Sequence, residues 1–261
     1  MKKLMIFSAA ALAGINFALA GIQLSGSAYV GYTPVTVPAG NTILSVPFCA
    51  FATGDSIELD KLVSTSGLTG AVDPAEADQL IVFIQSTSTY QYYYLNDDYN
   101  WSPLNTVVAG TETTDEPPPI DGVKLSNGYG VWLKTVSPTT AYLQGQVKNP
   151  TGMTIVKGLN LVGSGYPTDL DLNNNTQEWP ADVTKDQILI TGDNDSLITL
   201  RYANGKWMKS IMTEGSTNIL GIPVTQETLE DAPIIKAGTG FWYRRNGASS
   251  FTLNPAPKAK E

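Results

Sequence analysis

Histidine is absent from this chain of 261 residues, and cysteine occurs only once. Without histidine the chain cannot form a Ser-His-Asp triad or a Cys-His pair. A histidine-ligated zinc or haem site is excluded for the same reason, and one thiolate cannot hold a metal by itself. The enzyme classes that depend on imidazole are therefore excluded.

The single cysteine, Cys49, rules out an intramolecular disulfide. It lies in an apolar segment, and free cysteine is among the residue types most often buried, so an inert, buried thiol is the first interpretation. An intermolecular disulfide or a reactive thiol is the alternative.

Positive charge is also scarce, with 16 Lys and Arg against 24 Asp and Glu and a net charge of −8. Nucleic acid and anionic lipid both reward clustered positive charge. We therefore expect no nucleic-acid partner, and we attribute the acidic balance to solubility.

Long apolar runs are missing except at the N-terminus, where Met1-Lys2-Lys3 precedes an apolar stretch that ends at Ala18-Leu19-Ala20. A basic start, an apolar centre and a small-x-small end are typical of a secretory signal peptide. We predict a signal peptide over residues 1–20 and no transmembrane span after its cleavage. The location is then secreted, periplasmic or on the outer cell surface.

Two patterns occur twice at nearly constant spacing. Asp78-Gln79-Leu80-Ile81-Val82 returns 108 residues later (186 − 78) as Asp186-Gln187-Ile188-Leu189-Ile190. Gly128-Tyr129-Gly130-Val131-Trp132 returns 110 residues later (238 − 128) as Gly238-Thr239-Gly240-Phe241-Trp242. The spacing predicts two tandem homologous repeats, over 21–148 and 149–254, followed by a disordered tail at 255–261.

Each repeat consists of short β-prone runs separated by Gly, Asn, Pro and Thr, and helical patterns are few. Such runs are typical of an all-β sandwich or barrel. We predict two all-β, sandwich or barrel-like repeats with at most short helices. The Gly-x-Gly pairs precede β-type residues rather than a helix, so they favour a turn or bulge over a phosphate-binding loop.

Exposed aromatic residues are candidates for stacking on sugar rings. When the two repeats are aligned at the 108-residue offset, Tyr90, Tyr92 and Tyr94 match apolar residues of the second repeat. We therefore expect these three tyrosines to face the core. Tyr93 then faces water. We predict a weak ligand-binding set of Tyr93, Tyr99 and Trp101, although matched tryptophans are more often part of a core.

Calcium is the one cofactor for which the sequence offers ligands. Asp193 and Asp195 lie in Gly192-Asp193-Asn194-Asp195-Ser196, and clustered carboxylate and amide oxygens suit Ca²⁺. The EF-hand pattern is missing, and Asp and Asn also fill ordinary turns. Calcium at Asp193 and Asp195 is therefore one hypothesis, and no cofactor is the other.

Carboxylate chemistry needs neither histidine nor metal, because a glycosidase uses two carboxyl groups roughly 5 to 10 Å apart. Asp78 and Asp186 are the acidic residues that the two repeats share. Each immediately precedes a predicted strand, where a turn or cap role is the plainer interpretation.

The segment Ala28–Gly40, with its Val30-Gly31-Tyr32 sequence, resembles the start of a family of secreted proteins expanded in Verrucomicrobia and without an assigned function. The aliphatic run that ends near Pro47 and the closing Gly-x-Gly-x-Trp strand extend this resemblance over most of the chain. The resemblance implies a secreted or envelope-associated location and supplies no catalytic residues.

These observations favour a non-enzymatic secreted or cell-surface β protein that acts in adhesion, envelope assembly or ligand binding, with a glycan or another surface protein as partner. The alternative is a secreted carboxylate-based hydrolase acting on polysaccharide or glycoprotein. The polar loops differ between the repeats whereas the strands match, so any function should lie in what the repeats do not share.

Overall fold

The computed structural model describes residues 22–24, 28–50, 56–104, 107–108, 111–112, 120, 123–147, 152–192, 196–217 and 223–254. The predicted signal peptide and the predicted tail lie outside these residues. The described strands form open antiparallel sheets, and the all-β prediction is confirmed. The described ranges contain the short helix α1 (Leu59–Leu62) and the 3₁₀ turn η2 (Val183–Lys185).

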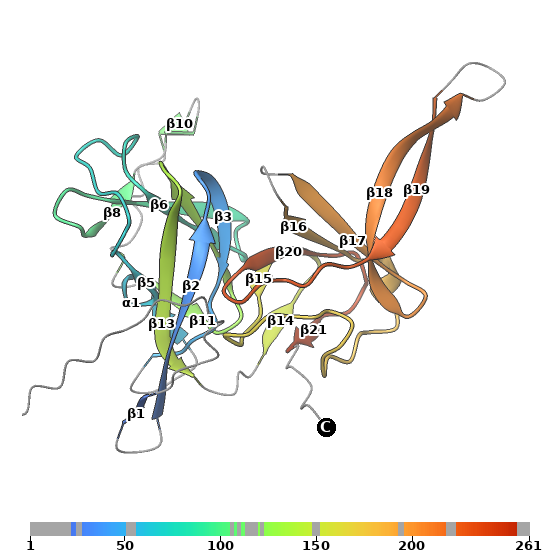
Figure 1. Ribbon diagram of the computed structural model, residues 1–261, viewed down its shortest axis with the longest axis horizontal. Coiled ribbons are helices and arrows are strands. Elements are labelled where there is room, and N and C mark those ends of the chain that lie inside the picture. The colour runs from blue at the N-terminus through green and yellow to red at the C-terminus, as the bar shows by residue number, and fades with distance from the viewer. Residues whose placement is uncertain are drawn as a thin grey trace, which may run out of the picture.

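The first half of the described chain, up to residue 147, is a sandwich of two sheets (Figure 1). One sheet has the order β1-β2-β13-β5, formed by Ile22–Leu24, Ala28–Val37, Thr139–Val147 and Val63–Ser64. The other has the order β3-β12-β6-β7-β8, formed by Gly40–Ser45, Gly130–Thr135, Gln79–Ile84, Thr89–Leu95 and Trp101–Leu104. Two short ladders complete this half: β4 (Ser56–Glu58) with β11 (Lys124–Ser126), and β9 (Val107–Val108) with β10 (Thr111–Glu112).

The core of the first half lies between its two sheets. Val35 and Leu143 contribute from β2 and β13, and Leu80 and Val131 contribute from the five-stranded sheet. Residues that alternate with them along each strand point away from the core, because successive strand side chains lie on opposite faces. The five-stranded sheet therefore has an outer face that its own half does not cover.

The second half, from residue 152, contains one large sheet of order β15-β20-β16-β17-β18-β19. Its strands are Gly158–Gly163, Gly240–Arg245, Gln187–Thr191, Leu197–Ala203, Lys206–Thr217 and Pro223–Asp231. The pair β14 (Met153–Ile155) and β21 (Phe251–Leu253) covers its inner face, where Trp207 and Tyr243 are fully buried. The hairpin β18–β19 extends well beyond the rest of this half (Figure 1).

The two large sheets have corresponding strand orders. The sequence β3-β12-β6-β7-β8 of the first half matches β15-β20-β16-β17-β18 of the second, strand for strand. Trp132 lies opposite Ile43 and Ile81, just as Trp242 lies opposite Leu161 and Leu189. The outermost strand, β19, has no counterpart among the described strands of the first half.

The edge strands β3 and β15 bring the two halves together, and their contacts are reciprocal. The backbone N–H of Ser45 donates to Gly238 O at 2.7 Å, and the N–H of Gly163 donates to Gly128 O at 2.9 Å. Isolated bridges join Leu44 to Thr239 and Tyr129 to Val162. Equivalent residues thus contact one another across an approximate twofold axis, as in an isologous dimer interface.

The geometry of this junction explains why the Gly-x-Gly-x-Trp motif contains glycine at two positions. Gly128 and Gly238 have φ angles of +86° and +77°, a region that glycine enters without steric cost. Gly240 leaves no room for a side chain, because an added Cβ would lie 2.5 Å from the Ile43 side chain of the other half. The motif turns the chain and then lets the two halves approach closely.

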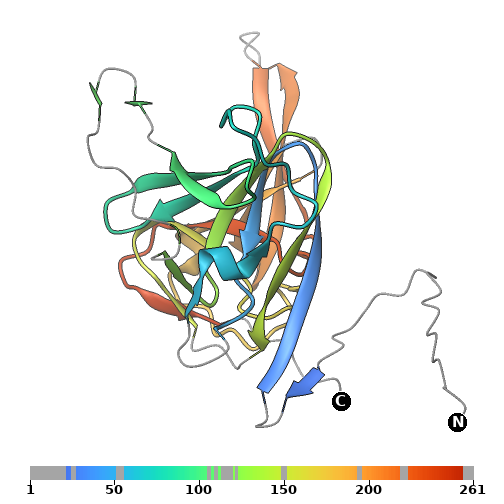
Figure 2. The ribbon, with the colours of Figure 1, turned by 90° about the vertical axis from the view of Figure 1, so that its left-hand side faces the viewer.

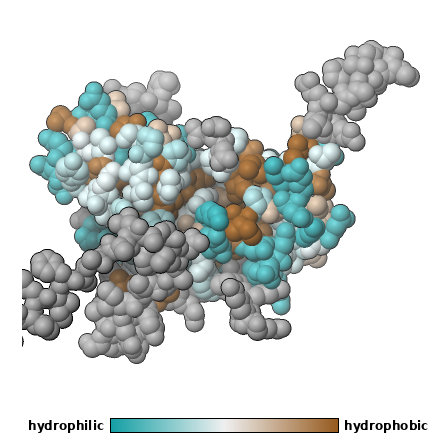
Figure 3. All heavy atoms as spheres, viewed as in Figure 1, coloured by the Kyte–Doolittle hydropathy of each residue, from teal (hydrophilic) through white to brown (hydrophobic). Residues whose placement is uncertain are grey.

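In the view of Figure 1, the first half is mostly pale with scattered hydrophobic and hydrophilic residues, and hydrophobic residues gather on the second half next to the junction, beside hydrophilic ones (Figure 3). Figure 2, turned by 90°, shows β2 and β13 running together along one side of the first half. Within the described part of the chain, no helix combines the length and hydropathy needed to cross a bilayer.

Candidate functional site

Strand β7 presents its tyrosines in the opposite way to that expected from the sequence. Tyr93 is fully buried in the first core, whereas Tyr90 is 41% exposed and Tyr92 and Tyr94 are half-buried. The prediction that Tyr93 faces water is therefore wrong.

The cause is a difference of one residue in the turn before this strand. In the first half Leu80 lies opposite Tyr93, and in the second half Ile188 lies opposite Leu200, so Tyr93 corresponds to Leu200. The offset in this strand is thus 107 (200 − 93) and not 108. A shift of one residue moves every side chain of a strand to the other face, which reversed the predicted orientation.

Trp101 is also buried, with 7% of its surface exposed, because it packs in the first core opposite Leu95. Burial removes Tyr93 and Trp101 from the set of residues that could stack on a sugar. Tyr99 is 55% exposed in the turn between β7 and β8, with its N–H donating to Asn96 O at 3.0 Å. The three residues therefore do not share one surface.

The outer face of the five-stranded sheet carries an apolar row across four strands. Register places Trp132 of β12 opposite Ile81 of β6, Ile81 opposite Tyr92 of β7, and Tyr92 opposite Leu104 of β8. Neighbouring strands lie about 4.8 Å apart, so such a row forms a continuous apolar track across the sheet.

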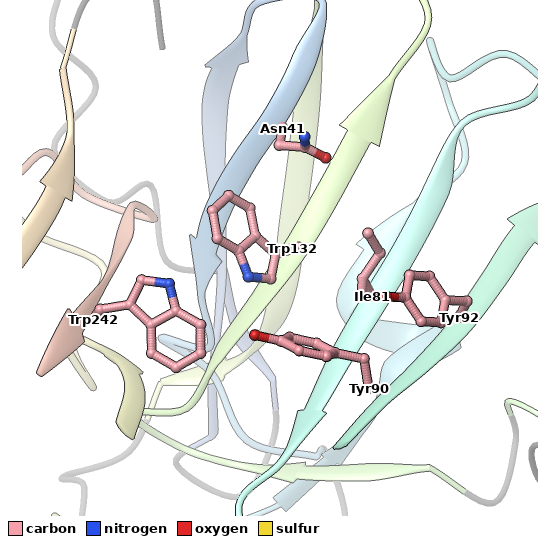
Figure 4. A pocket seen from close by; sticks show the side chains of 6 residues that line it. All are labelled: Asn41, Ile81, Tyr90, Tyr92, Trp132 and Trp242. Carbon is pink, nitrogen blue, oxygen red and sulfur yellow. The ribbon is translucent and has the colours of Figure 1, made fainter. Parts of the chain in front are cut away.

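A pocket of about 240 Å³ opens on this track at the junction of the halves. Its lining consists of Asn41, Ile81, Tyr90, Tyr92, Trp132 and Trp242. Figure 4 shows Trp132 between Trp242 on one side and the two tyrosines on the other, with the Tyr90 hydroxyl directed toward the tryptophans. None of the described residues that line it is a carboxylate.

The pocket needs both halves of the chain, since Trp242 belongs to β20 and the other lining residues to the first half. Phe83 holds Trp242 edge-on at a centroid distance of 5.1 Å, and it also contacts Tyr90 at 5.3 Å. Edge-to-face aromatic pairs of this kind stabilise a fixed ring orientation by about 1 kcal/mol.

The Tyr90 hydroxyl is available as a neutral hydrogen-bonding group. Burial, and secondarily the neighbouring Tyr92, raise the pKa of Tyr90. The rings of Tyr90 and Tyr92 lie 6.3 Å apart at a tilt of 49°. The two side chains together offer flat apolar surfaces with hydroxyl groups at their tips.

A polar row runs beside the apolar row on the same face. Asn41 lies opposite Lys134, Lys134 opposite Gln79, Gln79 opposite Tyr94, and Tyr94 opposite Ser102. A ligand that stacks on the apolar row would therefore find amide, hydroxyl and ammonium groups along one edge.

The corresponding face of the second half lacks the tyrosines. Thr199 lies opposite Leu189 where Tyr92 lies opposite Ile81, and Arg201 lies opposite Gln187 where Tyr94 lies opposite Gln79. The tryptophan is common to both halves, but the aromatic track belongs to the first half alone.

The calcium hypothesis falls on residues that the structure does not describe, because Asp193 and Asp195 lie between residues 192 and 196. Among the described residues, no group of three or more His, Cys, Asp and Glu is placed to hold a metal ion. Calcium at Asp193 and Asp195 stays a prediction.

The matched acidic residues have structural partners. Asp186 Oδ2 accepts hydrogen bonds from Arg245 Nη1 at 2.6 Å and from the Tyr243 hydroxyl at 2.8 Å. Asp186 Oδ1 accepts the N–H of Asn246 at 2.8 Å, and Asp78 Oδ1 accepts the N–H of Val136 at the same distance. Both carboxylates hold the chain where it leaves the tryptophan strand, which agrees with a turn role.

Arg245 is fully buried and is paired with both Asp186 and Asp182. The hydrogen bond that the Arg245 side chain donates is the main cause that lowers the pKa of Asp182. Burial raises the pKa of Tyr243 above its usual range. A general acid needs a raised carboxyl pKa, so the lowered pKa of Asp182 argues for a structural ion pair.

Two larger grooves flank the junction. One, of about 970 Å³, is lined by residues that include Val37, Ile190 and Ile234; the other, of about 600 Å³, is lined by residues that include Val82, Leu125 and Val156. They occupy corresponding positions on either side of the approximate twofold axis. Their linings mix aliphatic with polar side chains, and neither brings four aromatic rings together as the first pocket does.

Comparisons of the chain with protein-family models, with curated proteins and with solved structures found no match. The assignment of a function therefore rests on the residues and geometry of the site.

Proposed function

We propose that this protein is a non-enzymatic, secreted or cell-surface β protein that binds glycan in the pocket formed by Tyr90, Tyr92, Trp132 and Trp242. The observation that carries the proposal is an open pocket in which Tyr90, Tyr92 and Trp132 are partly exposed, with the amide of Asn41 beside them. Trp242 is only 9% exposed, so it forms a wall of the pocket rather than a free stacking surface. Sugar rings combine apolar C–H faces with hydroxyl edges, and aromatic rings with polar tips complement both features.

The secreted or cell-surface location in this proposal rests on the predicted signal peptide at residues 1–20.

The difference between the two halves supports a ligand role for the pocket. If the chain arose by duplication, the shared strands, glycines and tryptophans preserve the scaffold, whereas Tyr92 and Tyr94 are special to the first half. Their place on the outer face is not required by the core.

The test is a binding and cleavage assay on an array of soluble glycans and glycoproteins. We expect binding without release of new reducing ends. Tyr92→Ala should weaken binding about 5-fold to 10-fold, because it removes one stacking surface worth about 1 kcal/mol.

The matched control is Tyr32→Ala, since Tyr32 is 60% exposed on β2 of the opposite sheet and its loss should leave binding unchanged. Equal effects of the two substitutions would contradict the assignment of the site. Cleavage that disappears in a carboxylate variant would instead favour the hydrolase alternative.

A further inference from the structure

Free positive charge in this acidic protein is concentrated at few positions. Among the described residues, seven Lys and Arg side chains form ion pairs with carboxylates: Lys61, Lys124, Arg201, Lys206, Lys209, Lys236 and Arg245. The described cations outside these pairs are Lys134, Lys157, Lys185 and Arg244.

Two of these four cations stand at corresponding positions, each two residues beyond a tryptophan that lines the aromatic pocket. Lys134 follows Trp132 by two residues on β12, and Arg244 follows Trp242 by two residues on β20. Side chains two apart on a strand share a face, so each cation lies on the same outer face as its pocket tryptophan. Both are exposed.

The neighbours of both cations are polar or neutral. Lys134 lies between Asn41, which lines the pocket, and Gln79. Arg244 lies between Leu159 and Gln187. No described carboxylate lies directly across either strand from these cations, so their charges face solvent.

A neutral ligand would leave Lys134 and Arg244 without an ionic partner, whereas the seven paired Lys and Arg side chains already have one. Resting on the proposed glycan-binding function, we infer that the ligand is an acidic polysaccharide. Its sugar rings stack on the aromatic track, and its carboxylate or sulfate groups pair with Lys134 and Arg244. An arginine guanidinium can bind either group through two hydrogen bonds.

The net charge of −8 does not oppose this inference at close range. Charges are screened over about 8 Å at physiological ionic strength, so the groups next to the pocket dominate the local field. The described carboxylates that form ion pairs are neutralised by their own partners, and the pocket lining contributes none.

The test compares acidic polysaccharides with neutralised forms of the same backbones. Suitable pairs are polygalacturonate and its methyl ester, alginate and its carboxyl-reduced form, and chondroitin sulfate and its desulfated, carboxyl-reduced form. Calorimetric titration of the full-length secreted chain at low and high salt gives the affinities. We expect at least one acidic form to bind at least fivefold more tightly than its neutral counterpart, with a difference that shrinks as salt is added.

Two charge-removing variants and one control locate the effect. Lys134→Gln and Arg244→Gln should each weaken binding of the acidic form about fivefold, which corresponds to loss of one exposed ion pair. Lys61→Gln removes the same charge from α1, away from the pocket, and should not change the affinity.

The outcomes separate this inference from the function on which it rests. If neutral glycans bind as well as acidic ones, or if Lys134→Gln and Arg244→Gln bind like the unsubstituted chain, the acidic ligand is refuted while glycan binding stands. If no form of any glycan binds, the proposed function itself is refuted.

Discussion

Replacement of Gly240 by alanine tests how closely the two halves are packed. The added Cβ would lie 2.5 Å from Ile43 Cγ2, 2.9 Å from Leu44 O and 3.0 Å from Val162 O. Two of these three neighbours are backbone oxygens, which cannot move away by rotation of a side chain. The junction strands β3 and β15 must therefore shift to accommodate the methyl group.

The cost of such overpacking is about 1–3 kcal/mol, and backbone neighbours place Gly240→Ala toward the upper end. Alanine also restricts the unfolded chain, which offsets about 0.4–1 kcal/mol of the loss. We expect the free energy of unfolding to fall by about 2 kcal/mol. For a chain of this size the melting temperature should fall by roughly 4–8 °C.

Gly130→Ala is the matched control, because Gly130 occupies the corresponding position in the first half. There the closest neighbour is the flexible Leu161 side chain at 2.8 Å, and the nearest backbone atoms lie at 3.2 Å. We expect a loss of about 1 kcal/mol or less, because the leucine can adopt another rotamer.

Denaturant unfolding followed by tryptophan fluorescence measures both variants against the unsubstituted chain. A Gly240→Ala protein as stable as the unsubstituted chain would show that the halves are not closely packed at this point. A larger loss for Gly130→Ala than for Gly240→Ala would refute the distinction between backbone and side-chain neighbours.

Three further predictions concern other parts of the molecule. Asp186→Ala should lower the free energy of unfolding by about 3–5 kcal/mol in denaturant titration, because it leaves the buried Arg245 guanidinium without its fully buried carboxylate partner; a loss under 1 kcal/mol would contradict this. Burial raises the pKa of Tyr93 to about 12 from an unfolded value of about 10, so stability present below pH 10 should decline as the pH rises toward 12, and Tyr93→Phe should reduce that decline in alkaline unfolding curves. N-terminal sequencing of protein exported by its native host should begin at Gly21, and a sequence that begins at Met1 would contradict the predicted cleavage after Ala20.

The sequence alone determined the fold class, because the period of the apolar residues and the glycine-rich turns between them reflect local backbone geometry. The segment Thr42 to Val46 alternates in the way a strand requires, and β3 covers Gly40–Ser45. The pattern Gly128-x-Gly130 before apolar β-branched and aromatic residues predicted a turn that enters a strand, and Gly128 has the positive φ of such a turn. These features depend on a few neighbouring residues.

Which tyrosine faces the core was decided only by the tertiary structure. The orientation of β7 depends on its pairing with β6, and one residue more or less in the preceding turn reverses it. Composition could not resolve this, because Tyr90, Tyr92, Tyr93 and Tyr94 are chemically alike. The tertiary pairing placed Tyr93 inside and left Tyr90 and Tyr92 on the outer face.

The aromatic pocket likewise could not be predicted from one segment. Tyr92 and Trp132 are 40 residues apart (132 − 92), and Trp242 comes from the other half of the chain. Their proximity results from hydrogen-bonded register within one sheet and from the reciprocal contacts of Ser45 and Gly163 across the junction. The sequence determined the strands and turns because these are local, and only long-range pairing decided which side chains meet in the pocket.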